Sequence, residues 1–398
     1  MIALTAARLY TPLECIEQPL LLVEDGKIVE VSSRVARAIP ATAELLAFDD
    51  AILAPGFVDI HIHGGAGHDV MNDDSAGLAA MERLLAAHGV TSYFPTTVTG
   101  PVDQTLSALD RLVKEIEAGE KVNRAQPIGI HLEGPFISHA RRGVHPSENL
   151  LPPTVAMFDR FWQAARGHIR MMTIAPELEG AGEVIREATR RGVCVSLGHS
   201  DADLNAARAG VAAGARHCTH GFNAMRPLDH REPGIVGAML TDSRLTADII
   251  ADGIHLDPSI VTLFLKAKGV EGAVLITDAT AATGMPDGRY RLGTLEVEVK
   301  DGRCTADGKL AGSVLTMDRA VRNVMKFADW NLQDTTRLAS FNPARVVGLS
   351  DRGKIEAGCT ADLVVLNPQG EVIATMIRGV LTEAQSSRGA DARGADGR

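Results

Sequence analysis

The stretch Pro55-Gly56-Phe57-Val58-Asp59-Ile60-His61-Ile62-His63 decides both the fold and the chemistry that this chain can support. Its apolar residues predict a buried strand. The two histidines lie two residues apart, so their imidazoles project from the same face of that strand and can chelate a metal ion. Many proteins contain a His-x-His pair without a metal, so the meaning of the pair depends on the residues at the ends of later strands.

Further apolar runs follow this strand, and amphipathic helical segments such as 76–88 and 202–213 separate them. Strands that alternate with helices predict repeated βα units and a parallel sheet. Eight such strands close a (β/α)8 barrel, the α/β fold known as the TIM barrel. We expect the eight strands near residues 58–63, 91–98, 128–133, 170–175, 193–199, 216–220, 246–250 and 274–278.

Side chains that commonly bind metal ions stand at the carboxyl ends of five of these runs. Active sites of TIM barrels lie at this end of the strands. Imidazole nitrogens and carboxylate oxygens bind divalent ions, and a catalytic site keeps one position open for water. The sequence therefore predicts one metal site that is formed by His61, His63, Glu133, His199, His220 and Asp278.

The composition favours a large enzyme over other classes of protein. The chain has 398 residues, of which 45% are hydrophobic and 23% charged, enough for a barrel plus a smaller domain. A net charge of -10 argues against nucleic acid as a partner, because phosphate backbones need a basic face. The sequence shows neither a stretch of about 18 apolar residues nor a leader-like segment. We therefore expect neither membrane insertion nor export. The five cysteines are odd in number and form no C-x-x-C pair, which predicts reduced thiols and a cytoplasmic location.

The two ends of the chain predict a second, smaller domain. Residues 1–54 and 354–381 both alternate short apolar strands with turns, and a few isolated strands cannot bury enough surface alone. We expect them to pair into one discontinuous β-sandwich beside a barrel of residues 55–353. A hairpin insertion is expected near 286–312, and the composition of 382–398 predicts a disordered tail.

The chain carries a series of short motifs, which run Pro55-Gly56-Phe57-Val58-Asp59, His131-Leu132-Glu133-Gly134-Pro135, Gly198-His199-Ser200, Thr219-His220, Asn223-Ala224-Met225, Arg231-Glu232-Pro233-Gly234, Ala251-Asp252-Gly253-Ile254-His255, Thr277-Asp278-Ala279 and Leu310-Ala311-Gly312-Ser313. In this order they resemble the amidohydrolase superfamily, and within it the N-acetylglucosamine-6-phosphate deacetylases. The resemblance covers nearly the whole chain. It implies a metal-dependent hydrolase of amino-sugar catabolism that converts N-acetyl-D-glucosamine 6-phosphate to D-glucosamine 6-phosphate and acetate.

The resemblance also implies roles for individual residues. Glu133, His199 and His220 would hold one divalent ion, while His61 and His63 keep a second site possible. Zn2+ is the expected ion, with one or two per subunit, and Fe2+, Mn2+ and Co2+ are alternatives. A homodimer is implied, because in such enzymes a neighbouring subunit forms part of the pocket. The implied substrate contacts are His145, Asn223, Ala224, Arg231, His255, Leu310, Ala311 and Gly312.

The residue types suggest how the reaction would proceed. Asp278 would take a proton from the attacking water and deliver it to the leaving amine. Taken alone, Asp278 could instead cap a helix. The developing oxyanion needs a positive partner, which the metal and a histidine such as His145 or His255 can supply. Arg231 can bind phosphate oxygens bidentately.

The sequence counts against some other reactions of the superfamily and leaves others open. The fourth strand ends at Thr173-Ile174-Ala175-Pro176-Glu177, without the lysine that bridges the metals of many binuclear relatives, so Glu133 is the available bridge. This counts against dihydroorotase-like and urease-like enzymes. The galactosamine epimer of the substrate, or another amide, stays possible because fold and motif do not set sugar stereochemistry. A non-catalytic scaffold is disfavoured by the intact ligand set.

Overall fold

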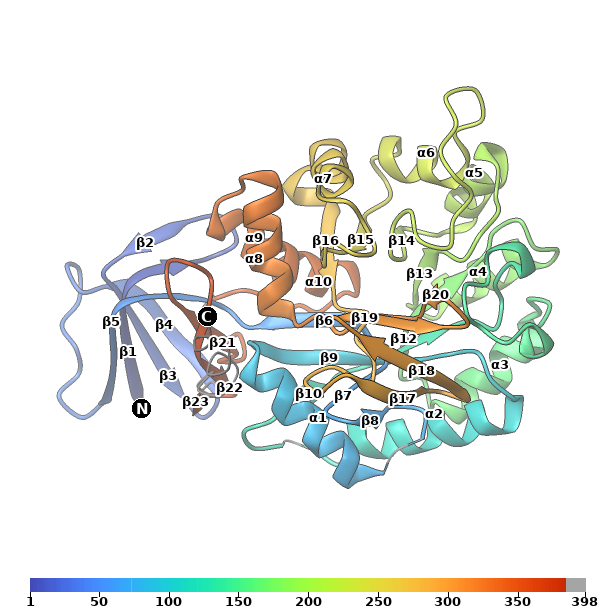
Figure 1. Ribbon diagram of the computed structural model, residues 1–398. Helices are drawn as coiled ribbons and strands as arrows, with labels where there is room; N and C mark the ends of the chain where they lie inside the picture. Colours follow the sequence, from blue (N-terminus) through green and yellow to red (C-terminus); the bar gives the residue numbers. More distant parts are fainter. Residues whose placement is uncertain (73, 120, 384–398) are drawn as a thin grey trace, which may run out of the picture.

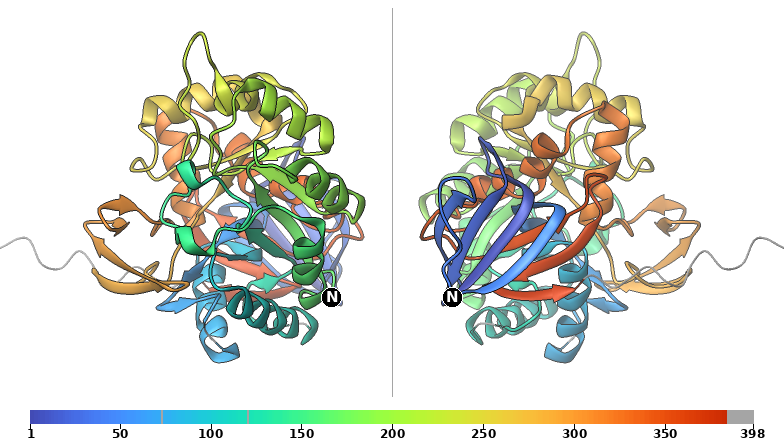
Figure 2. Two further views of the ribbon diagram at one scale, coloured as in Figure 1. Left: turned by 90° about the vertical axis from the view of Figure 1, so that its right-hand side faces the viewer. Right: turned by 90° about the vertical axis from the view of Figure 1, so that its left-hand side faces the viewer.

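The computed structural model describes residues 1–72, 74–119 and 121–383 (Figure 1). A small β-sheet body that contains both ends of the described chain lies at the left of Figure 1. A larger body with helices around its strands lies beside it. Figure 2 shows the same two bodies from either end.

Among the described residues, eight parallel strands of the larger body form the wall of the barrel, and each coincides with a predicted run. They are β6 (Phe57–Ile62), β9 (Val90–Thr97), β11 (Ile130–Glu133), β12 (Ile169–Ile174), β13 (Cys194–Leu197), β14 (His217–Cys218), β15 (Ala247–Ile250) and β16 (Ala273–Ile276). Hydrogen bonds join them in the order β6-β9-β11-β12-β13-β14 and, separately, β15-β16; the short β10 (Gln126–Pro127) pairs with β9. The predicted TIM barrel is confirmed.

At two places in the ring, isolated hydrogen bonds join neighbouring strands where no regular strand ladder forms among the described residues. We call these two places seams. At the first, the main-chain N–H of Asp278 donates to the carbonyl oxygen of His61 at 2.9 Å and so joins the end of β16 to β6. At the second, the Cys218 N–H donates to the Thr246 carbonyl oxygen at 3.0 Å, between β14 and β15. Side chains of His217 and Asp248 also contact each other across this second seam.

Helices follow the strands and cover the barrel. Short polar side chains begin several of them, since Asp74, Thr154 and Asp203 each accept main-chain N–H groups in the first turn. Among the described residues, no helix is long and apolar enough to cross a membrane. The helices are α1 (Ser75–Ala87), α2 (Val102–Glu117), α3 (Val155–Ala164), α4 (Ala181–Arg190), α5 (Leu204–Ala213), α6 (Gly234–Thr241), α7 (Pro258–Gly272), α8 (Met317–Ala328), α9 (Leu332–Ala339) and α10 (Phe341–Val346).

The small body is an eight-stranded sheet built from both chain ends. Its strands are β1 (Ile2–Tyr10), β2 (Cys15–Glu17), β3 (Pro19–Glu24), β4 (Lys27–Ser33), β5 (Glu44–Pro55), β21 (Leu363–Leu366), β22 (Val372–Ile377) and β23 (Val380–Glu383). Strand β21 runs antiparallel to β5, and Leu4, Leu21 and Met376 share one buried cluster. The fold class, a TIM barrel with a small discontinuous β-sandwich domain, is confirmed, and the strands of that domain form one hydrogen-bonded sheet. The tail expected at 382–398 lies outside the described residues, except for 382 and 383, which belong to β23.

A buried carboxylate joins the small sheet to the barrel. Asp362 contacts the guanidinium of Arg352, which also donates to Ser92 Oγ on β9 at 3.1 Å. The other oxygen of Asp362 accepts the N–H of Arg378 at 2.8 Å, and Arg378 has a left-handed φ of +51°. Burial raises the pKa of Asp362, although the charge of Arg352 opposes this effect. The joint therefore pairs its buried charge with a permanent cation.

The insertion after the last barrel strand forms a four-stranded antiparallel sheet of β17 (Gly288–Leu292), β18 (Leu295–Lys300), β19 (Arg303–Ala306) and β20 (Lys309–Leu310). Its first turn is fixed to the barrel. Asp69 Oδ2 accepts the Gly293 N–H at 2.8 Å, and Asn72 Nδ2 donates to the Gly293 oxygen at 2.7 Å. Gly293 has a φ of +58°, and a Cβ atom there would lie 2.3 Å from Val98 Cγ1. Only glycine fits this close approach.

Candidate metal centre and substrate pocket

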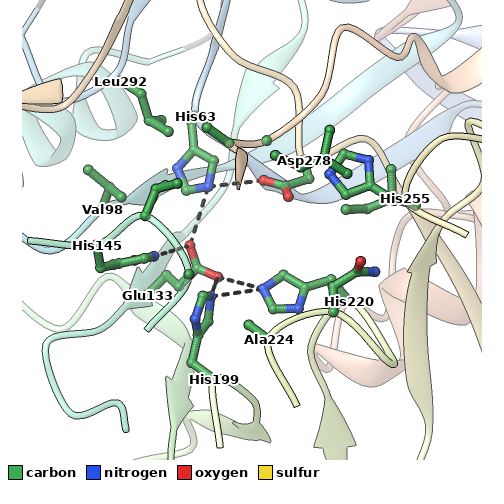
Figure 3. Close-up of a pocket in the computed structure, with 17 residues that line it drawn as sticks. His63, Val98, Glu133, His145, His199, His220, Ala224, His255, Asp278 and Leu292 are labelled. Carbon is green, nitrogen blue, oxygen red and sulfur yellow. Dashed lines mark hydrogen bonds and ion pairs between the residues drawn. The ribbon is translucent and has the colours of Figure 1, made fainter. Parts of the chain in front are cut away.

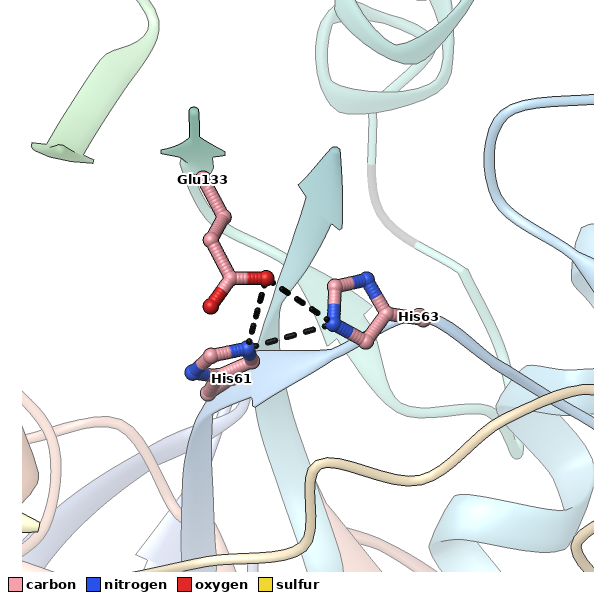
Figure 4. A group of neighbouring side chains, drawn as sticks. All are labelled: His61, His63 and Glu133. Carbon is pink, nitrogen blue, oxygen red and sulfur yellow. Dashed lines mark hydrogen bonds and ion pairs between the residues drawn. The ribbon is translucent and has the colours of Figure 1, made fainter. Parts of the chain in front are cut away.

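Five of the predicted ligand residues converge at the carboxyl ends of the barrel strands, with Glu133 in the middle (Figure 3). They are His63, Glu133, His199, His220 and Asp278, and His61 lies beside His63 and Glu133. Glu133 Oε1 lies 3.2 Å from His199 Nε2 and 3.1 Å from His220 Nε2. Its Oε2 lies 3.3 Å from His63 Nε2 and 3.4 Å from His61 Nε2 (Figure 4). The two oxygens of one carboxylate therefore face two different pairs of imidazoles.

Asp278 lies on the side of the cluster that His61 and His63 form. Its Oδ1 is 3.2 Å from His63 Nε2 and 3.6 Å from His61 Nε2. Its backbone is left-handed, with a φ of +50°, and its carbonyl oxygen accepts the Ser313 N–H at 2.7 Å. Turns follow Asp278, and the next helix, α8, begins only at Met317, so Asp278 caps no helix. Its side chain is free to serve the cluster.

Two of the histidines are oriented by main-chain carbonyl groups. His63 Nδ1 lies 3.0 Å from the Thr96 carbonyl oxygen, and His199 Nδ1 lies 3.0 Å from that of Arg141. A carbonyl oxygen can only accept a hydrogen bond, so each Nδ1 carries the proton. In the neutral imidazole each Nε2 is then the atom left free to bind a metal ion, which is the arrangement that metal-binding histidines adopt.

The electrostatics of the cluster oppose the effect of burial. Burial alone would raise the pKa of Glu133, yet the histidines around it, His61 first, hold that pKa well below its usual range. Burial would likewise raise the pKa of Asp278, but the same imidazole and that of His63 lower it to about 2. For His220, burial lowers the pKa and the hydrogen bond to Glu133 raises it, to about 9. The two carboxylates are thus ionised at neutral pH.

His145 faces the cluster as a hydrogen-bond donor. The main-chain N–H of Thr99 lies 3.3 Å from His145 Nδ1 and can only donate, so Nδ1 accepts and Nε2 carries the proton. That Nε2 is 3.7 Å from Glu133 Oε2. Burial, followed by the charge of His199, lowers the pKa of His145 to about 3. His145, Glu133 and His199 lie close enough to share an ion, but the proton on Nε2 favours a donor over a ligand.

A pocket opens over the cluster, and most of the predicted substrate contacts line it. These are His145, Asn223, Ala224, His255, Leu310, Ala311 and Gly312. The sequence did not single out several apolar wall residues, namely Val98, Val144, Ile250 and Leu292. Apolar side chains of this kind look the same in sequence whether they line a pocket or a core, so no signal marked them.

Arg231 lies away from this pocket lining. It is exposed in the connection between β14 and α6, which forms the yellow-green loop that projects from the molecule in Figures 1 and 2. Asp229 Oδ1 accepts the main-chain N–H of Arg231 at 2.8 Å. Arg231 therefore does not line the pocket of its own copy of the chain.

Two buried aspartates orient site residues and were not assigned a role from the sequence. Asp252 Oδ2 lies 2.7 Å from His255 Nδ1. Asp59 Oδ1 accepts the His61 N–H at 3.3 Å, and its Oδ2 accepts the Thr277 hydroxyl at 2.5 Å. Burial raises the pKa of Asp59 to about 6 despite these bonds. Both aspartates stand inside the short motifs of the sequence, Asp59 in the first and Asp252 in the segment Ala251–His255, which was the available signal.

His131 supports the cluster from behind. Its ring lies 4.7 Å from that of His61, centroid to centroid. His131 Nδ1 is 3.1 Å from the Ile60 carbonyl oxygen, and Nε2 is 2.8 Å from Thr173 Oγ1. Thr173 is on β12, and its hydroxyl therefore contacts His131 behind the cluster and not the cluster itself.

Known proteins resemble this chain along most of its length. Residues 52–382 match the Amidohydrolase family. The chain belongs to the amidohydrolase family and is a hydrolase. Within that family the predicted resemblance to the N-acetylglucosamine-6-phosphate deacetylases is confirmed.

Individual relatives share more than a third of their aligned residues with this chain. N-acetylglucosamine-6-phosphate deacetylase of Bacillus subtilis (strain 168) is 39% identical, covering 93% of this chain and 94% of the relative. N-acetylgalactosamine-6-phosphate deacetylase of Escherichia coli O157:H7 is 38% identical, covering 91% and 97%. A solved structure of a mutant N-acetyl-D-glucosamine-6-phosphate deacetylase from Mycobacterium smegmatis, in complex with N-acetyl-D-glucosamine-6-phosphate, has a TM-score of 0.90 at 37% identity, covering 96% of this chain and 98% of that one.

Proposed function

We propose that this enzyme hydrolyses the acetamide of N-acetyl-D-glucosamine 6-phosphate to D-glucosamine 6-phosphate and acetate in amino-sugar catabolism. The names of its relatives support the substrate. The observation that carries the proposal is the placement of Glu133 between two imidazole pairs, with Asp278 beside one of them, at the mouth of the barrel.

The donor set fits divalent metal ions, and we take Zn2+ as the first candidate, with Fe2+, Mn2+ and Co2+ as alternatives. Two nitrogens that each lie about 2.0–2.1 Å from a tetrahedral zinc are roughly 3.3 Å apart. The Nε2 atoms of His199 and His220 are 3.0 Å apart, and those of His61 and His63 are 3.2 Å apart. Both pairs match that spacing. A bound ion of this kind polarises a carbonyl group and lowers the pKa of water from about 15.7 to roughly 7.

We propose two ions per subunit on the basis of this geometry. Glu133 Oε1 with His199 and His220 would hold one, and Glu133 Oε2 with His61 and His63 would hold the other. Each oxygen of the carboxylate would then serve a different ion, which makes Glu133 the bridge.

Asp278 and His145 are the proposed proton-handling groups. Because its pKa is about 2, Asp278 is ionised at neutral pH and can accept a proton from the attacking water, then pass it to the leaving nitrogen. The Nε2–H of His145 points into the pocket lining and would donate to the amide oxygen as negative charge develops there. His255, oriented by Asp252, supplies a further donor.

A second copy of the chain would complete the phosphate site. Arg231 lies outside its own pocket, on an exposed loop, so we propose a homodimer in which this loop reaches the neighbouring pocket near Asn223 and Ala224. Arg231→Ala should raise KM for the phosphorylated sugar far more than for the unphosphorylated one. Arg190→Ala, which removes an exposed arginine on α4, is the matched control and should change neither value. Equal effects of Arg231→Ala on both sugars would contradict the phosphate role.

The main test combines an acetate-release assay with elemental analysis of the purified enzyme. We expect turnover of N-acetylglucosamine 6-phosphate and two equivalents of metal per subunit. Absence of acetate release would overturn the proposed reaction.

The galactosamine epimer is the second candidate substrate, since a relative of 38% identity carries that name. Comparing kcat/KM for the two epimers decides between them. A higher kcat/KM on the galactosamine epimer would make it the better assignment.

The proposed domain division is 1–54 with 354–383 for the small sheet, which includes all of β23, and 55–353 for the barrel. The antiparallel pairing of β21 with β5 supports this division. We also propose a cytoplasmic location, in keeping with the five cysteines, all of which are free thiols.

A further inference from the structure

His220 adopts a left-handed backbone at the end of a very short strand. Its φ is +32°, a conformation that residues other than glycine seldom adopt. From this conformation the imidazole Nε2 reaches to 3.0 Å from His199 Nε2 and 3.1 Å from Glu133 Oε1. The position of this proposed ligand therefore depends on whatever holds its backbone.

The side chain of Asp248, on β15, holds that backbone. Asp248 Oδ1 accepts the N–H of His220, and the Asp248 carbonyl oxygen accepts the N–H of Gly221 at 2.8 Å. Asp248 Oδ2 lies 2.8 Å from His217 Nε2, and His217 Nδ1 lies 2.6 Å from Thr246 Oγ1. Both Asp248 and His217 have 0% exposure. His217 thus fixes the carboxylate so that its other oxygen faces His220.

This use of a side chain contrasts with the other seam of the barrel. There, the N–H of Asp278 donates to a main-chain oxygen, that of His61. Between β14 and β15 no strand ladder continues as far as residue 220 within the described chain, so a carboxylate supplies the acceptor instead. A mutation can remove a side-chain acceptor, which makes its contribution measurable.

We propose that Asp248 is a positioning residue of the metal centre: together with His217, it holds the His220 backbone so that the imidazole faces Glu133 and His199. This inference rests on the proposed function, because it requires His220 to be a metal ligand. Asp248 acts through the main chain of His220, so its removal should displace a ligand while leaving every ligand side chain in the sequence.

The test uses two substitutions at one position. Asp248→Ala removes both acceptor oxygens, whereas Asp248→Asn keeps one oxygen at the same reach. We expect Asp248→Ala to weaken Zn2+ affinity and to lower kcat by about 10–100-fold, the usual cost of losing a group that orients a ligand, with little change in KM. Asp248→Asn should keep most of the Zn2+ affinity and most of the wild-type kcat. Zn2+ affinity is measured by competition with a chromophoric chelator, and the absorption spectrum of the Co2+-loaded protein reports the ligand geometry directly.

Asp362→Ala is the matched control. Asp362 is also buried, also accepts the N–H of a left-handed residue, Arg378, and lies at the joint between sheet and barrel. We expect it to lower the thermal unfolding midpoint but to leave Zn2+ affinity and the Co2+ spectrum unchanged. The contrast separates positioning of a ligand from general loss of stability.

His220→Ala distinguishes failure of this inference from failure of the proposed function. If His220→Ala keeps normal metal content and turnover, the proposed metal centre is wrong. If it loses both while Asp248→Ala behaves as wild type, only the positioning role is wrong. Should Asp248→Ala fail to fold, His217→Phe decides, because it keeps a ring but removes the bond that fixes the carboxylate. Unchanged Zn2+ affinity and an unchanged Co2+ spectrum in that variant would then overturn the proposal.

Discussion

Buried carboxylates occur in two different settings in this molecule. In the scaffold, Asp362 contacts Arg352 at the joint, and Asp318 on α8 lies 3.0 Å from His88 and also contacts an arginine. At the barrel mouth, Glu133 and Asp278 face imidazole nitrogens instead. Each of the two scaffold carboxylates thus pairs with an arginine. The two site carboxylates face imidazole nitrogens that can bind a metal ion.

The two settings indicate whether a buried carboxylate contributes to the stability of the fold or to metal binding and turnover. Clusters of buried polar groups at functional sites are seldom optimal for stability, since selection there acts on chemistry. Replacing a scaffold carboxylate should therefore change the free energy of unfolding and leave turnover alone. Replacing a site carboxylate should change metal content or turnover and leave the metal-free protein no less stable.

The largest effect is expected from Glu133→Gln. The substitution removes the charge that faces both imidazole pairs, so metal content should fall. We expect kcat to drop by more than about 10⁴-fold, beyond the roughly 10²–10⁴-fold that one proton-transfer group supplies. Elemental analysis and acetate release measure the two quantities. Retention of both ions with near-normal turnover would break the comparison.

Asp278→Asn should come next. Glu133 and the histidines remain, so metal content should stay near normal, while loss of the proton acceptor should lower kcat by on the order of 10²–10⁴-fold. Single-turnover acetate release with parallel metal analysis checks this. Near-normal turnover would remove Asp278 from the proton-transfer role.

A double substitution, His61→Asn with His63→Asn, sharpens the comparison within the site. It should reduce the metal content from two equivalents to one, because the pair His199 and His220 is left intact. Turnover should fall by about 10–100-fold, less than for Glu133→Gln, as one ion remains. If the wild type itself holds a single equivalent and the variant keeps it, the second site is wrong.

The smallest effect is expected from Asp318→Asn in the scaffold. Burial alone would raise the pKa of Asp318, but the hydrogen bond from His88 and the charge of Arg322 lower it well below the usual value of 3.8. The folded state then binds fewer protons than the unfolded state, so the stabilisation is present above about pH 4 and is lost as pH falls further. We expect a loss on the order of 1–2 kcal/mol at neutral pH.

Urea unfolding as a function of pH measures that loss. The stabilities of wild type and Asp318→Asn should converge as pH falls from about 4 toward 2, and kcat at neutral pH should not change. A constant difference across this range would show that the carboxylate contributes through packing, and a lower kcat would place it in the site.

The sequence predicted the barrel well because each strand is an apolar run that ends in a polar motif. The predicted strand at 216–220 nevertheless extends too far, since β14 ends at Cys218 and a bend begins at Thr219. The roles of Asp248 and Thr99 could not be predicted, because each depends on a hydrogen bond that crosses between distant segments. The exposed position of Arg231 was also hidden, since a charged motif does not reveal which way its loop projects.

The insertion of β17 to β20 has a consequence for how such enzymes diversify. It provides Leu292 and Leu310 to the cavity wall, yet it lies outside the ring of strands that bears the histidines, and Asp69 secures its first turn at Gly293. Changes within this appendage can alter the room left for a sugar without disturbing cation binding. We therefore expect substitution of Leu292 or Leu310 to change substrate preference more than metal content.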